Sequence, residues 1–596
     1  MESAEEFAKK TFDYIVVGGG LVGLALATLL ARDTAVSVGV IEAGSKKDDE
    51  TITIPGMVAR RLGDPEYDWA LKTTPQKNAD NREMAIHRGK MLGGSGGLHF
   101  MIFTRGSRVE YDGWEKLGVK GWGWNAMRSA IDASEVWTPP TQSAAAHHAD
   151  AVAESHGKDG YIKTFAFPEH SDLVHPYVST LNELGIPTNK SDSSGNNIGV
   201  WSATGSIDPI TKERSWSPNA YYEKVSHQTN ITVLTGARAH RVLLSDGEGV
   251  DVRAIGVKYS VGGQKYTVNV SREVVLSAGA LQTPQLLELS GIGNPKLLRE
   301  LGIPVHVDLP GVGENFQEHY SLTVHGELKS ADHISPEALF NPEFAKAELD
   351  KYHKTKTGMF STLFGTFCFA SARQFIPEAT FTRLLASLDE ALQAPEIQSS
   401  PYKPWYDLQR EFLVRDEIGQ IEIAFSPAWM HEGCKKEKSR HFTMALFIQR
   451  PWSRGYVHAK SANIEDPPEI EPNTLTSPAD IDTIILVEAI KFAMKIASTG
   501  KFGDLVEEFL VPSPTSTDEQ LVEYVKKTVR CALHPAGSAA MLPRGAQGVL
   551  DDELKVYGTS NLRVADASMF PTALGTHPQA TLYGLAHRAA DFITGR

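Results

Sequence analysis

The sequence predicts an α/β protein with two lobes, and three observations lead to that prediction. The chain has 596 residues, which exceeds the length of a single typical domain. Its composition, with 41% hydrophobic and 22% charged residues, is close to the average for folded proteins. Near the amino end, an apolar run, a glycine turn and a second apolar run follow one another, which is typical of a strand that leads into a helix.

An uncharged run near the amino end has the length of a membrane span. No charged residue occurs between positions 14 and 31. Acidic residues outnumber basic ones ahead of the run, however, which does not fit a signal peptide. The run also divides into a strand at Asp13–Val17, a turn at Gly18–Gly20 and a helix at Leu21–Ala31. We therefore expect a buried strand and helix, no membrane partner, and residence in the cytoplasm.

Net charge and cysteine content narrow the range of partners. The chain has 59 basic and 73 acidic residues, which gives a formal charge of -14. Because affinity for nucleic acid depends on basic surface, we do not expect nucleic acid as a partner. The three cysteines, Cys368, Cys434 and Cys531, lack the spacing of zinc ligands. We predict no disulfide framework and no structural metal site.

A GGGLVG segment that begins at Gly18 matches the dinucleotide-binding pattern GxGxxG. Gly18 allows a tight turn, Gly20 lets the backbone approach a pyrophosphate, and Gly23 lets the helix pack closely on the strand. Residues 36–41 are predicted to form the second strand, with Glu42 at its end, where an acid can bind the ribose of adenosine. An acid there disfavours a ribose phosphate, so NADP is not expected, whereas FAD and NAD both remain open.

Three longer segments carry a pattern that extends over most of the chain. The first is RGKMLGGSGGLHFMIFTRG, which begins at Arg88, and the second is SAGALQTPQLLELSGIG, which begins at Ser277. The third starts with CALHPAGS at Cys531 and continues through NLRVADAS at Asn561 to THPQ at Thr576. Together they resemble the signatures of the glucose-methanol-choline (GMC) flavoprotein oxidoreductases. The resemblance implies FAD and a GMC fold, in which a Rossmann-like FAD domain carries a substrate domain built on an antiparallel sheet backed by helices.

Several residues of these segments can be given physical roles. Gly93 and Gly94 belong to a loop with few side chains, which can lie close to a pyrophosphate or to the edge of a flavin ring. Asp566, at the end of a predicted strand, can accept a hydrogen bond from a ribityl or ribose hydroxyl. The helix that begins at Gln579 would point its amino end at the flavin and stabilise negative charge on the reduced ring. By resemblance, the other cofactor-binding residues are Arg88, Leu98, His99, Phe100, Ala239, Ala567 and Pro578.

Two of the 20 histidines are candidates for the chemistry. His534 and His577 each begin a His-Pro step, and each stands where the family carries its active-site pair. The resemblance makes His534 the base that removes the hydroxyl proton of a primary alcohol, since a neutral imidazole is a competent base near neutral pH. His577 would hydrogen-bond to the same oxygen and orient it. The carbon-bound hydrogen would leave as a hydride to flavin N5, which produces an aldehyde.

The first signature departs from many relatives at His99, where they carry asparagine. A histidine at this place resembles the aryl-alcohol oxidase and pyranose dehydrogenase branches of the family. In the sugar-oxidising branch this histidine can be joined covalently to the flavin, whereas in the aryl-alcohol branch it only packs against the ring. We expect noncovalent binding here.

The carboxy-terminal segments must reach the same flavin as the amino-terminal ones, so the FAD domain is predicted to be discontinuous. Residues 1–325 would form most of it, with some stretches crossing to the other lobe, and residues 528–596 would return to it with the histidine pair. Residues 326–527 would form the substrate domain. Alternating apolar residues at 420–425 and 441–449 predict strands there.

Aromatic residues concentrate in two parts of the predicted substrate domain. They can form its core, or they can form an aromatic entrance to the flavin. Such an entrance would suit aryl, allylic or furanic primary alcohols better than sugars, which need several polar partners. The two clusters are Phe360, Phe364, Phe367 and Phe369, then Phe425, Trp429 and His431.

The leading hypothesis is therefore an FAD-dependent oxidoreductase that passes electrons from a small-molecule alcohol to oxygen or to a quinone-like acceptor. A sugar or polyol dehydrogenase of the same family is one alternative. A lyase or cyclase that keeps FAD without redox use is another. The glycine fingerprint alone would also allow an NAD-linked enzyme or a nucleotide-binding module without activity. The oligomeric state stays open.

Overall fold

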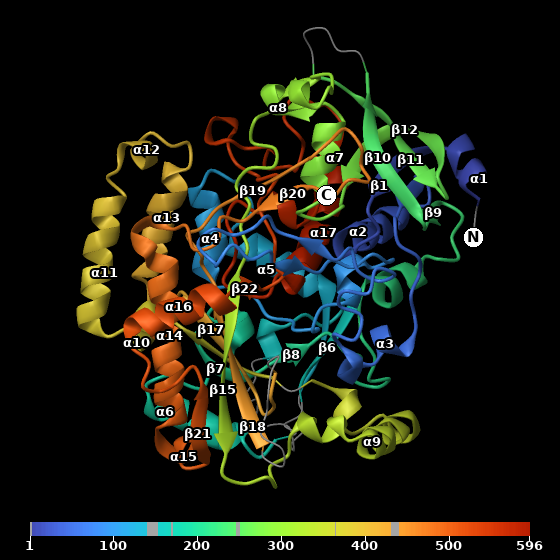
Figure 1. Cartoon of the computed structure of the whole chain (residues 1–596). Helices are drawn as coiled ribbons and strands as arrows, with labels where there is room; N and C mark the ends of the chain where they lie inside the picture. The colour runs from blue at the N-terminus through green and yellow to red at the C-terminus, as the bar shows by residue number, and fades with distance from the viewer. Residues whose placement is uncertain are drawn as a thin grey trace.

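The computed structural model describes residues 3–139, 153–167, 171–245, 251–363, 365–430 and 440–595. Two large sheets dominate these ranges, one in the upper and one in the lower part of Figure 1. The carboxy-terminal helix α17 (Gln579–Thr594) packs on α2 (Leu21–Ala31) and α5 (Trp124–Ser134) near the centre of the molecule. The predicted α/β architecture with two lobes is confirmed.

The first sheet contains the predicted Rossmann-like unit. Its strands lie in the order β10-β11-β12-β1-β2-β9, and β23 pairs with the carboxyl end of β12. Strands β23, β12, β1, β2 and β9 are parallel, whereas β10 and β11 extend the sheet as an antiparallel pair. The strands are β1 (Thr11–Val17), β2 (Val38–Ile41), β9 (Ile231–Leu234), β10 (Ala237–Leu244), β11 (Ala254–Val261), β12 (Gln264–Leu276) and β23 (Leu562–Val564).

The uncharged amino-terminal run folds as β1, a glycine turn and helix α2, which confirms its division into strand, turn and helix. Every residue of α2 after Leu21 is buried, and this burial accounts for the absence of charge. Within the described ranges, no helix combines the length and the apolar character needed to cross a bilayer.

The second sheet is antiparallel and has the order β21-β15-β18-β17-β16-β7, with β22 paired to β15. Strands β17 and β18 confirm the two strands expected from alternating apolar residues. The strands are β7 (Gly199–Ser202), β15 (Tyr320–Leu328), β16 (Thr366–Ala370), β17 (Ile421–Ser426), β18 (Arg440–Ile448), β21 (Val506–Val511) and β22 (Arg530–Cys531).

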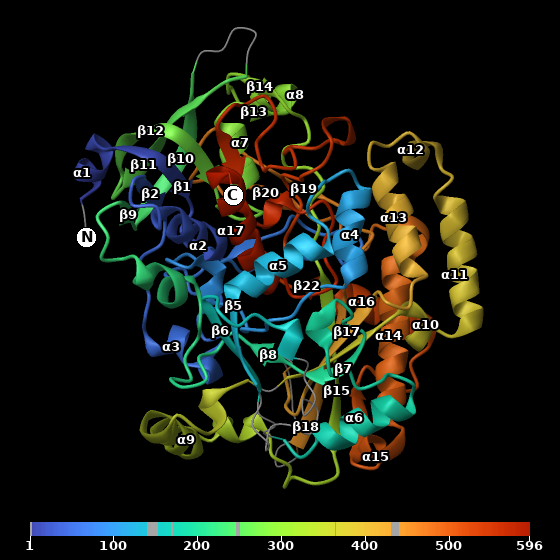
Figure 2. The same ribbon diagram turned by 180° about the vertical axis from the view of Figure 1, so that it is seen from behind.

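Helices back this second sheet. Helix α14 (Ile481–Ala497) packs on β18, β15 and β21, and α16 (Asp518–Thr528) packs on α14 and β15. Helices α11 and α13 form the outer flank in Figure 1 and again in the reverse view of Figure 2. The remaining helices of six or more residues are α1 (Ala4–Lys9), α4 (Arg108–Lys116), α6 (Val174–Glu183), α7 (Thr283–Leu289), α8 (Pro295–Glu300), α9 (Pro342–Thr355), α11 (Glu378–Ala391) and α13 (Lys403–Leu413).

The chain crosses between the two lobes several times. Strand β7 belongs to the second sheet, and the chain then returns to the first sheet with β9 and β10. Likewise β22 belongs to the second sheet, and the chain then returns to the first lobe, where α17 packs on α2. The hairpin of β19 (Tyr456–His458) and β20 (Glu469–Glu471) contacts α7. The domain limits at residues 325 and 527 stay a prediction.

Candidate active site

A cavity of about 1170 Å³ lies between the two sheets. Its walls come from the carboxyl ends of β1 and β2, from the loop before His99, from the face of β15, β17 and β18, and from the segments that carry His534 and His577. Residues predicted from four distant stretches of sequence therefore surround one space. They are Gly18, Gly20, Glu42, Arg88, Gly94, Leu98, His99, Phe100, Ala239, His534, Asp566, Ala567, His577, Pro578 and Gln579.

At one end of the cavity, two glycine segments lie against each other. A Cβ atom on Gly94 would come 2.9 Å from the Cα of Gly20, whereas a Cβ atom on Gly20 would meet nothing nearer than 3.9 Å. Helix α2 begins directly after Gly20, and no side chain caps its first amides. Free amides at a helix amino end, beside open space, suit a pyrophosphate.

Two of the predicted glycines do not line the cavity. A Cβ atom on Gly23 would lie 2.0 Å from the carbonyl oxygen of Gly18, so its role is the close packing of helix on strand. A Cβ atom on Gly93 would lie 2.4 Å from the ring of Trp216. Gly93 therefore packs against this ring on the side of the loop away from the cavity, where there is no room for a side chain. Gly94 is the one of the two glycines that faces the cavity.

Two acidic residues, Glu42 and Asp566, line the cavity and accept hydrogen bonds from backbone amides. Glu42 accepts hydrogen bonds from the amides of Gly19 at 2.8 Å and Gly44 at 2.7 Å, and burial raises its pKa to about 7. Asp566 accepts hydrogen bonds from the amide of Gly279 at 2.9 Å and the hydroxyl of Thr283 at 2.6 Å. Burial also raises the pKa of Asp566. Both carboxylates line the cavity, where hydroxyl groups of a ligand can reach them.

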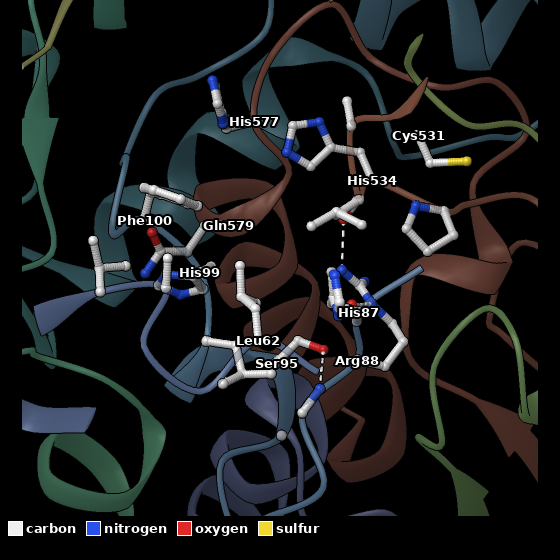
Figure 3. Close-up of a pocket in the computed structure, with 18 of the residues that line it drawn as sticks. Leu62, His87, Arg88, Ser95, His99, Phe100, Cys531, His534, His577 and Gln579 are labelled. Atoms are coloured by element: carbon white, nitrogen blue, oxygen red, sulfur yellow. Dashed lines mark hydrogen bonds between the residues drawn. The ribbon is translucent and has the colours of Figure 1, made fainter. Parts of the chain in front are cut away.

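The two predicted histidines meet at the other end of the cavity. Their ring centroids are 4.9 Å apart and their planes are inclined by 76°. His534 lies on the loop after β22, and His577 lies two residues before α17. In the view of Figure 3 the two histidines lie in the upper part of the pocket, His99 and Gln579 on the left, and Arg88 and Ser95 below.

A further histidine, His319, contacts the predicted base. The Nδ1 atoms of His319 and His534 are 3.0 Å apart. Burial lowers the pKa of His319 to about 3, and burial together with the neighbouring His577 and His319 holds the pKa of His534 well below its usual range. Both imidazoles are therefore neutral near neutral pH.

His577 is held by a carboxylate of the second sheet. Its Nε2 lies 2.8 Å from Oε1 of Glu422, and Oε2 of Glu422 accepts a hydrogen bond of 2.7 Å from Gln449. The rings of Phe367 and Phe447 pack against the imidazole at 5.7 and 6.3 Å between centroids. The orientation of His577 is thus set by contact with one carboxylate and by two aromatic rings.

The backbone that carries His534 is clamped from both sides. Leu533 has a φ of 69°, which is uncommon for a residue with a branched side chain. Arg88 donates a hydrogen bond of 2.6 Å to the carbonyl oxygen of Leu533, and Glu318 accepts one of 2.6 Å from the amide of His534. Burial raises the pKa of Glu318 to about 8. We call Arg88 and Glu318 the backbone clamp.

His99 lies on the cavity wall with one ring nitrogen already bonded. Its Nδ1 accepts a hydrogen bond of 2.9 Å from the amide of Met101, and its Nε2 is buried without a hydrogen-bond partner among the described residues. The buried Arg214 donates to the carbonyl oxygens of Ile52, Gly96 and His99. Burial and then the charge of Arg214 hold the pKa of His99 well below its usual range. His99 is a neutral imidazole whose Nε2 is left for a ligand.

Helix α17 begins beside the histidines. Pro578 precedes its first turn without a side-chain cap, and Gln579 donates a hydrogen bond of 2.7 Å to Ser206. An uncapped helix amino end stabilises negative charge nearby, as expected for this position.

The aromatic clusters are divided between core and cavity. Phe369 stacks on Trp201 and is fully buried away from the cavity, whereas Phe360, Phe367, Phe425 and Trp429 line it. Both interpretations of these residues therefore hold in part. Phe364 and His431 lie outside the described residues.

Sequence reasoning missed the residues that hold the histidines. They come from the segment before β15, from β17, and from β18 and the residue after it, far from either histidine in sequence. Glu422 gives one signal, because it is an acid within a strand of otherwise apolar and small residues. The missed residues are Glu318, His319, Glu422, Phe447 and Gln449.

The residues present fit FAD. The space is continuous from the glycine segments and Glu42 to the histidine pair, which is the reach that a dinucleotide with a flavin ring requires. The open sides of Gly20, where a Cβ atom would meet nothing nearer than 3.9 Å, and of Gly279, where it would meet nothing within 4 Å, leave room for the backbone to touch a ligand.

Comparisons with known proteins agree. Two sequence profiles of the GMC oxidoreductases match residues 12–321 and 451–586. The GMC oxidoreductase family protein Mala s 12 of Malassezia sympodialis is 32% identical, over 98% of this chain and 93% of its own. The structure of an FAD-dependent oxidoreductase from Chaetomium thermophilum has a TM-score of 0.89 at 29% identity, covering 98% of this chain and 99% of that one. A fungal aryl-alcohol oxidase has a TM-score of 0.87 at 26% identity, covering 98% and 99%.

The chain belongs to the GMC oxidoreductase family. It is an FAD-dependent oxidoreductase, which sets aside the NAD-linked enzyme and the module without activity. Family membership implies a small-molecule substrate and an electron acceptor.

Proposed function

We propose that the protein oxidises a primary alcohol, of aryl, allylic or furanic type, to the aldehyde. In this proposal His534 removes the hydroxyl proton and His577 orients the hydroxyl oxygen. When bound, FAD supplies the acceptor for the hydride that leaves the carbinol carbon. One observation carries the proposal, which is that two imidazoles lie 4.9 Å apart in the same cavity as the glycine segments.

The neighbours of His534 support one of its nitrogens as the base. His534 and His319 face each other through Nδ1, so one of these two nitrogens carries the shared hydrogen. Only when His534 donates does its Nε2 keep a lone pair for the hydroxyl proton. His319 is then the acceptor, and its low pKa keeps it neutral in that role. His319 is in this proposal a positioning residue that selects the tautomer of the base.

His577 has a different role in this proposal, which follows from the contact of its Nε2. Because its Nε2 is held by Glu422, its Nδ1 is the nitrogen left for the substrate oxygen. Glu422 is fully buried and is fixed in turn by Gln449, so the imidazole cannot turn without losing its contact with this carboxylate. If Nδ1–H of His577 donates to the hydroxyl oxygen while Nε2–H donates to Glu422, the hydroxyl keeps its own hydrogen for Nε2 of His534, which supports the roles given to the pair.

The walls near the histidines support an apolar alcohol. Phe100, Phe367, Phe447 and Leu533 line the cavity together with the pair. A site of this kind binds an aromatic or unsaturated carbinol by surface contact and offers few hydrogen bonds to the several hydroxyls of a sugar.

Anaerobic flavin reduction tests the proposal. The purified holoenzyme is mixed without oxygen with aryl alcohols, furanic alcohols, sugars, choline and short aliphatic alcohols, and the oxidised flavin absorbance is followed. We expect benzylic, allylic or furanic alcohols to bleach it fastest. Faster bleaching by sugars would favour the polyol dehydrogenase, and product formation without bleaching would favour a lyase or cyclase. Air or a quinone admitted afterwards identifies the electron acceptor.

A further inference from the structure

The second sheet forms a long floor for the substrate side of the cavity. The cavity is lined by Ser321 and Thr323 of β15, by Ala424 and Ser426 of β17, and by Thr443, Ala445 and Phe447 of β18. Each set is spaced by two residues, so all of these side chains lie on one face of the sheet. We call this face the cavity floor.

The strand register divides the floor into rows. Glu422, Phe447 and Ser321 lie opposite one another in the first row, where Glu422 holds His577. The second row contains Ala424, Ala445 and Thr323, and the third contains Ser426, Thr443 and His325. All of these except His325 are small and line the cavity. The fourth row contains His441 and Glu327. Because Phe447 and His441 are six residues apart on β18, the rows extend over about 20 Å.

A second carboxyl group stands at the far end of this floor. Glu337, from the short helix η8 (Pro336–Phe340), lines the cavity, and its side chain is only 2% exposed. Its Oε1 lies 2.6 Å from the amide of Trp429 and 3.2 Å from Nδ1 of His441. Its Oε2 has no hydrogen-bond partner among the described residues.

Three other polar residues at this end bond to one another, whereas Nε2 of the buried His441 has no partner among the described residues and His441 does not line the cavity. Both ring nitrogens of His325 lie 2.9 Å from a threonine hydroxyl, one on Thr443 and the other on Thr323. Thr443 donates a hydrogen bond of 2.6 Å to the carbonyl oxygen of Ala428. These residues form a fixed frame, so Oε2 of Glu337 is the acceptor with spare capacity that the frame presents to a ligand.

The cavity reaches solvent near Glu337. Phe340 and Met430 both line the cavity and are 64% and 53% exposed. The substrate side of the cavity therefore has the histidines at its inner end, small floor residues along its length, and a buried carboxyl group beside its opening.

We propose that Glu337 forms a second substrate subsite, which binds a hydrogen-bond donor at the distal end of an elongated primary alcohol. The inference rests on the proposed function, because it places the reactive end of that alcohol at His534 and His577. The donor is a hydroxyl or a protonated amine, both of which donate hydrogen bonds to a carboxyl oxygen. The small side chains of the second and third rows leave room for the connecting chain.

Three series of primary allylic alcohols with a linear tail test this subsite. They end in a methyl, a hydroxyl or an ammonium group, and each is made in increasing chain length. Binding to the holoenzyme is measured by calorimetry, which needs no turnover, and anaerobic flavin reduction is followed in parallel. At the length that spans the floor, we expect the hydroxyl and ammonium compounds to bind about tenfold or more tightly than the methyl compound.

Two variants separate recognition from support of the fold. Glu337→Gln keeps an oxygen for the amide of Trp429 and should lose the preference for ammonium while keeping part of the preference for hydroxyl. Glu337→Leu should lose both. Glu348→Gln is the matched control, because Glu348 also accepts a backbone hydrogen bond, from Met359, and does not line the cavity.

Several outcomes would overturn the subsite. An equal loss of affinity for all three series in Glu337→Gln would show that the residue is only structural. Equal affinity of the native enzyme for the three series would rule out the subsite. If the compounds bind with the expected preference but none of them reduces the flavin, the proposed function fails and the subsite stands.

Discussion

At the nucleotide end of the cavity, the wall consists of glycine backbone and helix amides, whereas at the substrate end both histidines are held by other side chains. Gly20 and Gly94 act through the side chains that they lack. His534 and His577 act through His319 and Glu422, which fix their rings. The first end should therefore be sensitive to any added atom, and the second to the loss or neutralisation of a single partner.

The largest effect is expected from an added side chain at the nucleotide end. In Gly20→Val the new atoms enter open space within the cavity, so we expect the fold to survive and bound flavin to be lost almost completely. Flavin absorbance per protein and the thermal unfolding midpoint measure the two properties. Gly23→Ala is the matched change, because its Cβ would lie 2.0 Å from a backbone oxygen and should lower the unfolding midpoint itself. Full flavin content in Gly20→Val would contradict a pyrophosphate site beside Gly20.

At the other end, loss of the carboxylate behind His577 should be felt in turnover. In Glu422→Gln the hydrogen-bond acceptor remains while the charge is lost, and we expect flavin reduction to slow by about 10-fold to 100-fold with flavin still bound. Stopped-flow absorbance gives the rate, and flavin content gives the control. An unchanged rate would show that the contact between Glu422 and His577 is only structural.

A smaller effect is expected from the backbone clamp, and it depends on pH. Glu318 has a pKa of about 8 in the folded protein and an ordinary value of 4.5, so the folded state retains a proton that the unfolded state releases. Stability should therefore fall as pH rises from about 4.5 to about 8. Glu318→Gln keeps the acceptor for the amide of His534 and should flatten this fall, with a change of a few-fold in kcat. The change in Tm between about pH 5 and about pH 8 is measured in the native protein and in Glu318→Gln. An equal change in the two proteins would contradict this role.

The smallest effect concerns His99, where we predict no covalent bond. Acid precipitation of the holoenzyme should leave the flavin in the supernatant. Flavin that stays with the pellet in the native enzyme, and is released in His99→Ala, would show attachment at Nε2, the ring nitrogen left without a partner.

The same contrast explains how much could be predicted from the sequence. The turn at Gly18, helix α2 and Glu42 follow one another within a short stretch, so local pattern and spacing sufficed to predict them. His319 precedes His534 by 215 positions and Glu422 precedes His577 by 155, and no local pattern connects such pairs. Gly93 shows a second reason, because only the packed ring of Trp216 reveals that it supports the loop from outside the cavity.

His534, as the proton acceptor in a cavity shared with the flavin, is the residue on which the proposed function most depends. The direct measurement is the anaerobic rate of flavin reduction by a benzylic alcohol in native enzyme and in His534→Ala, compared at equal flavin content. We predict a decrease of about 100-fold to 10,000-fold in the variant. Reduction at the native rate would contradict the assignment of the base.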